Sequence, residues 1–372
     1  MSFHKKALYT DMTQNYLTPV EPMSHTRVKV RFRTGRGNVD RVTICYNGQK
    51  AIMRKDSFDD MFDYYAYHIR LTDEPIYYHF EVEAEDESCY YNWLGISKSE
   101  EARYDFILVP GFATPDWAKG AVVYQIYVDR FYNGDSSNDV VNDEYYYQGR
   151  PVKHAGHWND PVSRTDEGTF YGGDLQGIID KMDYLEGLGV EVLYLNPIFV
   201  SPSSHKYDIQ DYRHIDPHFG KIVNREECGL KDGYEQYRGI TTDRENLEAS
   251  DRLFARLVEE AHKRGMKVIL DGVFYCCGSW HRFMDKEGIY ANGDTCSIKG
   301  AYQDSNSPYR EYFQYKNPQD ANSYENWWGY EAYAKFNYEN SRKLYEYILS
   351  VAVKWVSKPF CADGWRVDVA AS

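Results

Sequence analysis

The sequence predicts an α/β protein that carries a β-sandwich at its N-terminus. Residues 1–115 contain short runs that alternate between apolar and polar side chains, as strands of a two-layer sandwich do. Residues 116–372 then alternate between apolar strands and helices, which is the pattern of a parallel sheet with buried strands. Four such strands can be counted in this second part.

The N-terminal strands are short and are bounded by turn residues. The clearest alternation spans residues 26–32 and 41–46, and the second run ends at Asn47-Gly48, a hairpin signal. Further strands are expected at 62–71 and 76–82. The pattern alone leaves three roles open for this domain: it binds glycan, it forms a dimer contact, or it braces the domain that follows.

The strand and helix pattern begins after a linker marked by Pro110-Gly111 and Pro115-Asp116. Strands are expected at 122–128, 190–195, 266–271 and within 361–370, and helices at 175–188, 247–262 and 341–356. Asp174 is the expected N-cap of the first helix, and Gly189 its stop.

Two long excursions interrupt this pattern. The first excursion covers residues 128–172, and the second covers residues 272–340 and contains an expected inserted domain at about 273–338. Both leave from the C-terminal end of a strand, where barrel enzymes carry their active-site loops.

The charge and the aromatic content of the chain indicate which kinds of molecule it could bind. The 372 residues include 43 basic and 57 acidic side chains, giving a net charge of −14, and no basic cluster is present. Nucleic acids and anionic membranes are therefore poor candidates, because both need clustered Lys and Arg. Aromatic residues make up 16% of the chain, including 36 Tyr, which favours a ligand with apolar faces and hydroxyl rims, such as a sugar chain. A Tyr-rich core explains most of them equally well.

The cysteines predict a reducing environment. Seven occur at scattered positions without a C-x-x-C pair, so a zinc site is not expected: they are Cys45, Cys89, Cys228, Cys276, Cys277, Cys296 and Cys361. The N-terminus shows no signal-peptide pattern, and we expect a cytoplasmic protein.

The final stretch, residues 361–370, contains the residues that are the strongest candidates for catalysis. Trp365, Val367 and Val369 alternate with Arg366 and Asp368, so a buried strand is expected with both charges on one face. At the mouth of a barrel, Arg366 would keep Asp368 ionised, and Asp368 would be a candidate nucleophile for sugar chemistry. The alternative is a strand that ends in a surface ion pair.

A second set of residues is rich in oxygen ligands. Asn133, Asp135, Asn138 and Asp139 follow the first strand, and Gly172 and Asp174 come later. Six to eight hard oxygens suit Ca²⁺, although the spacing is not that of an EF-hand. The first cluster alone is equally typical of an Asx-rich turn.

Three runs together resemble a known family. They are Y-Q-I-Y-V-D-R-F-Y-N-G-D-S-S-N-D, F-Y-G-G-D-L-Q-G-I-I-D-K-M-D-Y-L, and residues 189–212. From about Trp117 onward, the chain resembles the α-amylase family of glycoside hydrolases, and within it the neopullulanase, cyclomaltodextrinase and maltogenic amylase group. The resemblance implies a (β/α)8 TIM barrel, of which about the first half is present, preceded by a carbohydrate-binding module at 1–115.

The resemblance also implies roles for individual residues. Asp368 would be the nucleophile, with Arg366 as its orienting partner and Asp271 steadying Arg366. Tyr207 would stack on the sugar at the cleavage site, beside His205. The oxygen-rich residues would hold a structural Ca²⁺: Asn133, Asp135, Asn138, Asp139, Gly172 and Asp174.

The chain departs from the family pattern in two ways. Tyr275 and Cys276 stand where Asn and His are expected after Asp271, and Cys is a weak hydrogen-bond donor. Only four barrel strands can be counted, so the carboxylic acid that would protonate the leaving oxygen has no counterpart among these residues, and we expect the 372 residues alone to be incomplete and inactive.

Two functions follow from these patterns. The first is a retaining glycoside hydrolase that acts on α-1,4-glucosidic bonds, with α-1,6 bonds also in reach, of maltodextrins, cyclodextrins or pullulan. The alternative is a catalytically impaired glucan-binding or regulatory protein on an amylase scaffold. A homodimer through the N-terminal domain is a further expectation.

Overall fold

The computed structural model describes residues 3–85, 87–162, 167–225, 233–291 and 298–370. The chain divides into two compact units, Met1–Gly120 and Ala121–Ser372. Cys228 and Cys296 lie outside the described residues; the other five cysteines are free thiols. Among the described residues, no helix is both long and apolar enough to cross a membrane.

The first unit is built from two antiparallel sheets. One sheet has the order β1-β2-β6-β5, and the other has the order β4-β3-β7-β8-β9, with β10 also paired to β7. Their bounds are Leu17–Thr18 (β1), Arg27–Gly35 (β2), Arg41–Tyr46 (β3), Gln49–Ile52 (β4), Arg54–Phe58 (β5), Phe62–Arg70 (β6), Ile76–Ala84 (β7), Glu87–Asn92 (β8), Gly95–Ser97 (β9) and Phe106–Leu108 (β10). Alternate residues such as Val28, Val30 and Phe32 are buried between the sheets, because side chains on a strand point to opposite faces.

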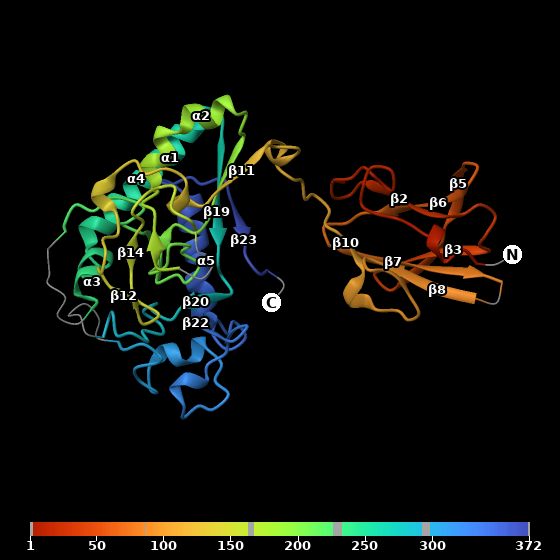
Figure 1. Ribbon diagram of the computed structural model, residues 1–372. Helices are drawn as coiled ribbons and strands as arrows, with labels where there is room; N and C mark the ends of the chain where they lie inside the picture. Colours follow the sequence, from red (N-terminus) through yellow and green to blue (C-terminus); the bar gives the residue numbers. More distant parts are fainter. Residues whose placement is uncertain (1–2, 86, 163–166, 226–232, 292–297, 371–372) are drawn as a thin grey trace. The chain divides into compact units, whose positions relative to one another are not determined.

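The second unit is organised around four parallel strands in the order β11-β16-β19-β23 (Figure 1). Their bounds are Val123–Ile126 (β11), Val192–Leu195 (β16), Lys267–Gly272 (β19) and Gly364–Val367 (β23). The order of these four strands in the sheet is the same as their order along the chain, and helices or excursions connect each strand to the next. This is the arrangement of consecutive βα units in a TIM-type barrel. All four C-terminal ends therefore meet at one edge of the sheet.

The described part of this unit contains five α-helices: Leu175–Asp180 (α1), Met182–Gly187 (α2), Glu235–Thr241 (α3), Arg244–Lys263 (α4) and Arg342–Val356 (α5). The helix expected over 175–188 is split into α1 and α2, because Lys181 leaves helical geometry at φ −100° and ψ 8°. Its predicted N-cap is confirmed, since the Asp174 side chain accepts a hydrogen bond from the Gly177 backbone N–H at 2.6 Å.

The excursions form small sheets of their own. The first excursion contains Tyr146–Tyr147 (β12), Arg150–Pro151 (β13), Lys153–His154 (β14) and Thr169–Phe170 (β15). A pair of strands after β16 consists of Phe199–Val200 (β17) and Asp211–Ile215 (β18). The second excursion contains Cys276–Gly278 (β20), Asn326–Trp327 (β21) and Tyr330–Lys335 (β22). A separate aromatic core joins the two excursions, with Tyr145, Tyr237 and Trp280 packed against one another.

The prediction of a buried strand over 361–370 is wrong in length and in burial. The strand β23 covers only Gly364–Val367, and Val367 is 49% exposed. Among the described residues β23 pairs with β19 alone, so it is an edge strand with one side open. Val369 lies beyond it, at φ 48°.

Candidate functional site

The candidate site begins where β19 and β23 end. Asp271 and Arg366 are directly paired in the parallel register of these strands. The Arg366 Nη1 atom donates to both carboxylate oxygens of Asp271, at 3.1 and 3.2 Å, and to Oδ1 of Asp368, at 2.6 Å. One guanidinium therefore bridges two carboxylates that come from neighbouring strands.

Asp271 is the buried anchor of this arrangement. Besides Arg366, it accepts hydrogen bonds from the hydroxyls of Tyr194 and Tyr207, the latter at 3.0 Å. Burial raises the pKa of Asp271, while these hydroxyls and the Arg366 charge oppose the rise. Sequence reasoning missed Tyr194. Tyr194 pairs in register with Ile269, two residues before Asp271. Because residues two apart on a strand point to the same face, this spacing could have predicted that Tyr194 and Asp271 lie on one face of the sheet.

The structure places Tyr207 and His205 next to this anchor. Their ring centroids are 5.9 Å apart, and Nδ1 of His205 accepts the backbone N–H of Tyr207 at 3.0 Å. That bond favours a proton on Nε2, which lies 3.4 Å from the Tyr333 hydroxyl and 3.5 Å from Glu167. The hydrogen bond to His205 lowers the pKa of Glu167, against the effect of burial. Glu167 and Tyr333 were also missed from the sequence.

Asp368 itself is partly covered, and its side chain is 15% exposed. Its backbone N–H donates to the Gly272 carbonyl at 3.0 Å, which fixes the residue just beyond the last sheet pair. The Asp368 side chain turns to Arg366 and is thereby linked through Asp271 to Tyr207. The residues expected to act together from the sequence are thus brought together: Asp271, His205, Tyr207, Arg366 and Asp368.

Tyr275 precedes β20, and Cys276 is the first residue of this strand. Tyr275 lines a pocket of about 460 Å³ together with Asp368, Tyr338 and Val367. Cys276 is fully buried, and burial raises the pKa of its thiol. A neutral, buried thiol offers little to a substrate, because the thiolate is the reactive form.

The oxygen-rich residues form one cluster after β11. Asn133 donates to the Asp139 carboxylate at 2.8 and 3.1 Å, and a Cβ built on Gly172 would meet both of these side chains at 2.5 Å. Asn138 donates to Asp174 at 3.2 Å. Gly172 has φ 80°, so glycine is required there both for its backbone and for this close approach.

This cluster fits a cation in part. Oδ1 of Asn138 is buried without a hydrogen-bond partner, and burial raises the pKa of Asp139 to about 6. Both features are those of oxygens that a cation would satisfy. Asp135 is less suited, because its carboxylate already accepts from Lys221 at 2.6 Å and from Ser137. Within the described residues, no group of three His, Cys, Asp or Glu side chains is arranged to hold a metal, so amide and carbonyl oxygens would have to complete the set.

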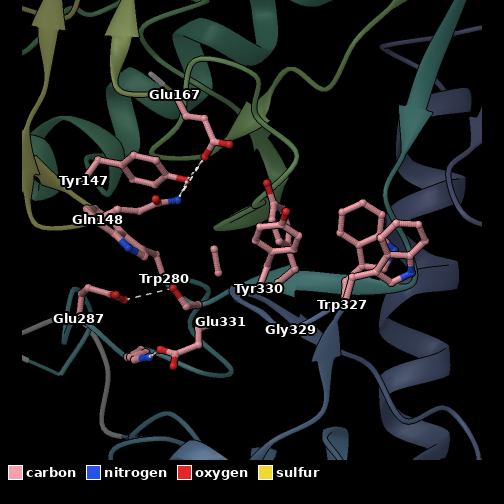
Figure 2. Close-up of a pocket in the computed structure, with 14 residues that line it drawn as sticks. Tyr147, Gln148, Glu167, Trp280, Glu287, Trp327, Gly329, Tyr330 and Glu331 are labelled. Carbon is pink, nitrogen blue, oxygen red and sulfur yellow. Dashed lines mark hydrogen bonds and ion pairs between the residues drawn. The ribbon is translucent and has the colours of Figure 1, made fainter. Parts of the chain in front are cut away.

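A second pocket lies beside His205 rather than at Asp368. It has a volume of about 680 Å³ and is lined by side chains of both excursions, among them Glu167, Trp327 and Tyr333 (Figure 2). Trp280 also lines this pocket, but it is only 4% exposed and packs in the aromatic core.

Family models match nearly the whole chain. Residues 125–228 and 249–372 match a model described as the catalytic domain of alpha amylase, and residues 1–109 match the alpha amylase N-terminal ig-like domain.

Individual relatives agree with these models. Neopullulanase 2 of Thermoactinomyces vulgaris is 32% identical, over 94% of this chain and 53% of its own length. Cyclomaltodextrinase of Thermoanaerobacter pseudethanolicus is 31% identical, over 94% of this chain and 54% of its own length. The solved structure of the type III pullulan hydrolase from Thermococcus kodakarensis superposes with a TM-score of 0.57 at 26% identity, over 97% of this chain and 56% of that one. The chain thus spans about half the length of these relatives, and it belongs to the alpha-amylase family of glycoside hydrolases.

Proposed function

We propose that the protein is a retaining glycoside hydrolase that cleaves α-1,4-glucosidic bonds, and α-1,6 bonds where its loops admit them, in maltodextrins, cyclodextrins or pullulan. The observation that carries this proposal is that the Arg366 guanidinium is hydrogen-bonded to both Asp271 and Asp368. Asp271 in turn accepts a hydrogen bond from the hydroxyl of Tyr207. The printed names of the relatives, neopullulanase and cyclomaltodextrinase, support this substrate class.

In this proposal Asp368 attacks the anomeric carbon, the bond from this carbon to the glycosidic oxygen breaks, and the resulting glycosyl ester is then hydrolysed by water. Arg366 keeps Asp368 ionised and oriented, and Asp271 fixes Arg366. The face of Tyr207 supports the apolar face of the sugar, and Nε2–H of His205 donates to a sugar hydroxyl. We assign the proton donor for the leaving oxygen to no residue of this chain.

A structural Ca²⁺ in the cluster around Asn138 and Asp139 is part of the proposal. The orphaned Oδ1 of Asn138 and the buried Asp139 carboxylate support it. Such an ion would brace the first excursion through Gly172 and Asp174, and we give it no part in the chemistry. The five free cysteines support a cytoplasmic location. The N-terminal unit as a glycan-binding module and dimer contact remains a prediction.

A fluorinated α-maltosyl fluoride tests the nucleophile directly. Fluoride leaves without a proton, so the assay does not depend on a general acid, and fluorine on the sugar ring slows hydrolysis of the ester. We expect peptide mapping of the full chain to find one maltosyl group on Asp368, and none in Asp368→Asn. A label on another residue, or none on any, would contradict the proposed nucleophile.

The alternative is a glucan-binding protein with little or no activity. The buried thiol of Cys276 favours it, because Cys is a weak hydrogen-bond donor at the position where the family pattern expects His. Binding of maltoheptaose by a chain that maltosyl fluoride never labels would support this second function.

A further inference from the structure

His205 is contacted at both ring nitrogens by groups that are connected to one buried carboxylate, that of Asp208. Ser203 contacts Nδ1 of His205 and donates to Oδ1 of Asp208. Glu167 contacts Nε2 and is connected through Tyr147 to Oδ2. We propose that Asp208 is a positioning residue, which acts through His205 on the sugar at the cleavage site. This inference rests on the function proposed above and adds what fixes the orientation of the His205 ring.

The Nδ1 side of His205 is fixed through Ser203. The Ser203 hydroxyl lies 3.1 Å from Nδ1, and Oδ1 of Asp208 accepts both this hydroxyl and that of Ser201, the latter at 2.7 Å. Both serines are fully buried and Asp208 is 2% exposed, so these hydrogen bonds lie in a region of low dielectric, where they are strong. Loss of the carboxylate would leave Ser203 free to turn, and the ring would lose a fixed neighbour at Nδ1.

The same serines also hold the loop that carries His205. Lys206, the next residue, has φ 62°, a region that crowds any residue with a side chain. Its backbone N–H donates to the Ser203 hydroxyl at 3.0 Å, and its Nζ donates to the Ser201 carbonyl oxygen at 2.7 Å. Strained backbone of this kind persists only where its surroundings fix it, and it concentrates at functional sites. By holding both serines, Asp208 stabilises the loop conformation on which the place of His205 depends.

The Nε2 side of His205 is connected to the other oxygen of Asp208. Tyr147 of the first excursion donates its hydroxyl to Oδ2 of Asp208 at 2.9 Å. Nε2 of Gln148 donates to the Tyr147 hydroxyl and to Oε2 of Glu167, at 3.2 Å each (Figure 2). The same Oε2 of Glu167 lies 3.5 Å from Nε2 of His205. One carboxylate thus supports the groups at both ring nitrogens.

The charge of Asp208 exceeds what these contacts require for folding. Within the described part of the chain, its hydrogen-bond donors are three hydroxyls, those of Ser201, Ser203 and Tyr147. A hydroxyl can donate or accept, so a neutral amide could satisfy the same groups without burying a charge. An ionised carboxylate can only accept, so it directs all three hydroxyl protons towards itself. The oxygen of Ser203 is thereby fixed beside Nδ1 of His205.

A double-mutant cycle tests whether Asp208 acts through His205. In the full chain we expect Asp208→Ala to slow labelling of Asp368 by the fluorinated maltosyl fluoride about tenfold, but less than about twofold when His205→Gln is already present. Asp208→Asn keeps one acceptor oxygen and should restore part of the rate. A purely structural role would slow labelling equally in both backgrounds, and that result would overturn the proposal.

Ser203→Ala and Ser201→Ala form a matched pair of variants. Both remove a buried hydroxyl from Oδ1 of Asp208, so both should lower the melting temperature to a similar extent. Of these two hydroxyls, the one that contacts His205 is that of Ser203. We therefore expect labelling to slow about fivefold in Ser203→Ala and to stay within about twofold of the parent in Ser201→Ala. Equal labelling rates in the two variants would contradict the proposal.

Nitrogen NMR of the full chain with isotope-labelled histidine reads the His205 ring without substrate, and His205→Gln assigns its signals. In the parent, Nδ1 accepts the Tyr207 backbone N–H, so we expect one tautomer with two well-separated ring-nitrogen resonances. In Asp208→Ala the loosened ring should exchange its proton between both nitrogens, and the resonances should move together. Unchanged resonances would refute the inference. This change in a chain that the fluoride never labels would support the positioning of His205 by Asp208 and refute the proposed function.

Discussion

Arg366 and Asp368 stand two residues apart in the sequence, and their side chains meet with Nη1 2.6 Å from Oδ1. The same nitrogen contacts the buried carboxylate of Asp271. Because Asp271 is held by two tyrosine hydroxyls as well, the position of Asp368 depends on groups from three parallel strands and one loop. This relationship generates the first two predictions.

Replacing Arg366 should impair Asp368 without removing it. In Arg366→Ala the Asp271 carboxylate stays buried without its cation, and Asp368 loses its orienting partner. We expect labelling by the fluorinated maltosyl fluoride to slow about 100-fold, as for the loss of a preorganised charge contact. Arg366→Lys should restore little, because a lysine is not a planar donor. Arg342→Ala, on the exposed surface of α5, is the control, and an unchanged labelling rate in Arg366→Ala would refute the orienting role.

Two substitutions at Tyr207 should separate its hydroxyl from its ring. Tyr207→Phe removes only the 3.0 Å hydrogen bond to Asp271, whose net worth is about 1 kcal/mol, so labelling should slow roughly fivefold. Tyr207→Ala also removes the platform for the sugar and should slow labelling further and raise the concentration needed for half-maximal rate. Tyr184→Ala, an exposed position on α2, is the control. Equal effects of Phe and Ala at 207 would contradict stacking.

The sequence predicted most of the fold because local periodicity reports which face of an element is buried. Arg41–Tyr46 forms a strand over the expected residues, and Asp174 caps its helix as expected. The break at Lys181 was missed, since apolar spacing is the same in one helix and in two consecutive ones. The exposure of β23 was missed because alternation does not tell a central strand from an edge strand.

The candidate site was predicted less completely than the fold. Arg366 and Asp368 were found because the alternation of the last strand places both charges on one face, and Asp271 was found from the family resemblance. Tyr194, Glu167 and Tyr333 were missed, since their contacts join segments far apart in the sequence.

Calcium should stabilise the second unit through the Asn138 and Asp139 cluster. An ion that binds only the folded state at one hundred times its dissociation constant adds about 2.7 kcal/mol to the free energy of unfolding. We expect the melting temperature to rise when Ca²⁺ is added after chelation, and this rise to vanish in Asp139→Asn. Asp143→Asn is the matched control, because Asp143 is exposed and lies nearby at φ 60°. An equal rise in both variants would place the ion elsewhere.

A buried charge network predicts how stability depends on pH. His218 lies between Glu144, at 2.9 Å from Nε2, and Asp216, at 3.1 Å from Nδ1, and Lys206 contacts Asp216 at 2.7 Å. Both ring nitrogens face carboxylates, so both carry protons and His218 is cationic, while Arg225 lies 4.0 Å from Glu144 on its other oxygen. Burial lowers the pKa of His218, but Glu144 and Asp216 outweigh burial and raise it.

The sign of the effect follows from this shift. The folded state holds the His218 proton above pH 6.5, where the unfolded chain loses it, so the stabilisation is complete below about pH 6.5 and is lost as pH rises through the folded pKa. Asp216 has the opposite shift, because Lys206 and His218 outweigh burial and lower its pKa, and its contribution is lost as pH falls below about 4. We expect the melting temperature to be highest between these limits.

In His218→Gln the loss of stability above pH 6.5 should disappear, and the free energy of unfolding should fall by roughly 3 kcal/mol, as when one partner of a buried ion pair is removed. The exposed His157→Gln should keep the parent profile, and a His218→Gln profile that still declines above pH 6.5 would show that another group is responsible.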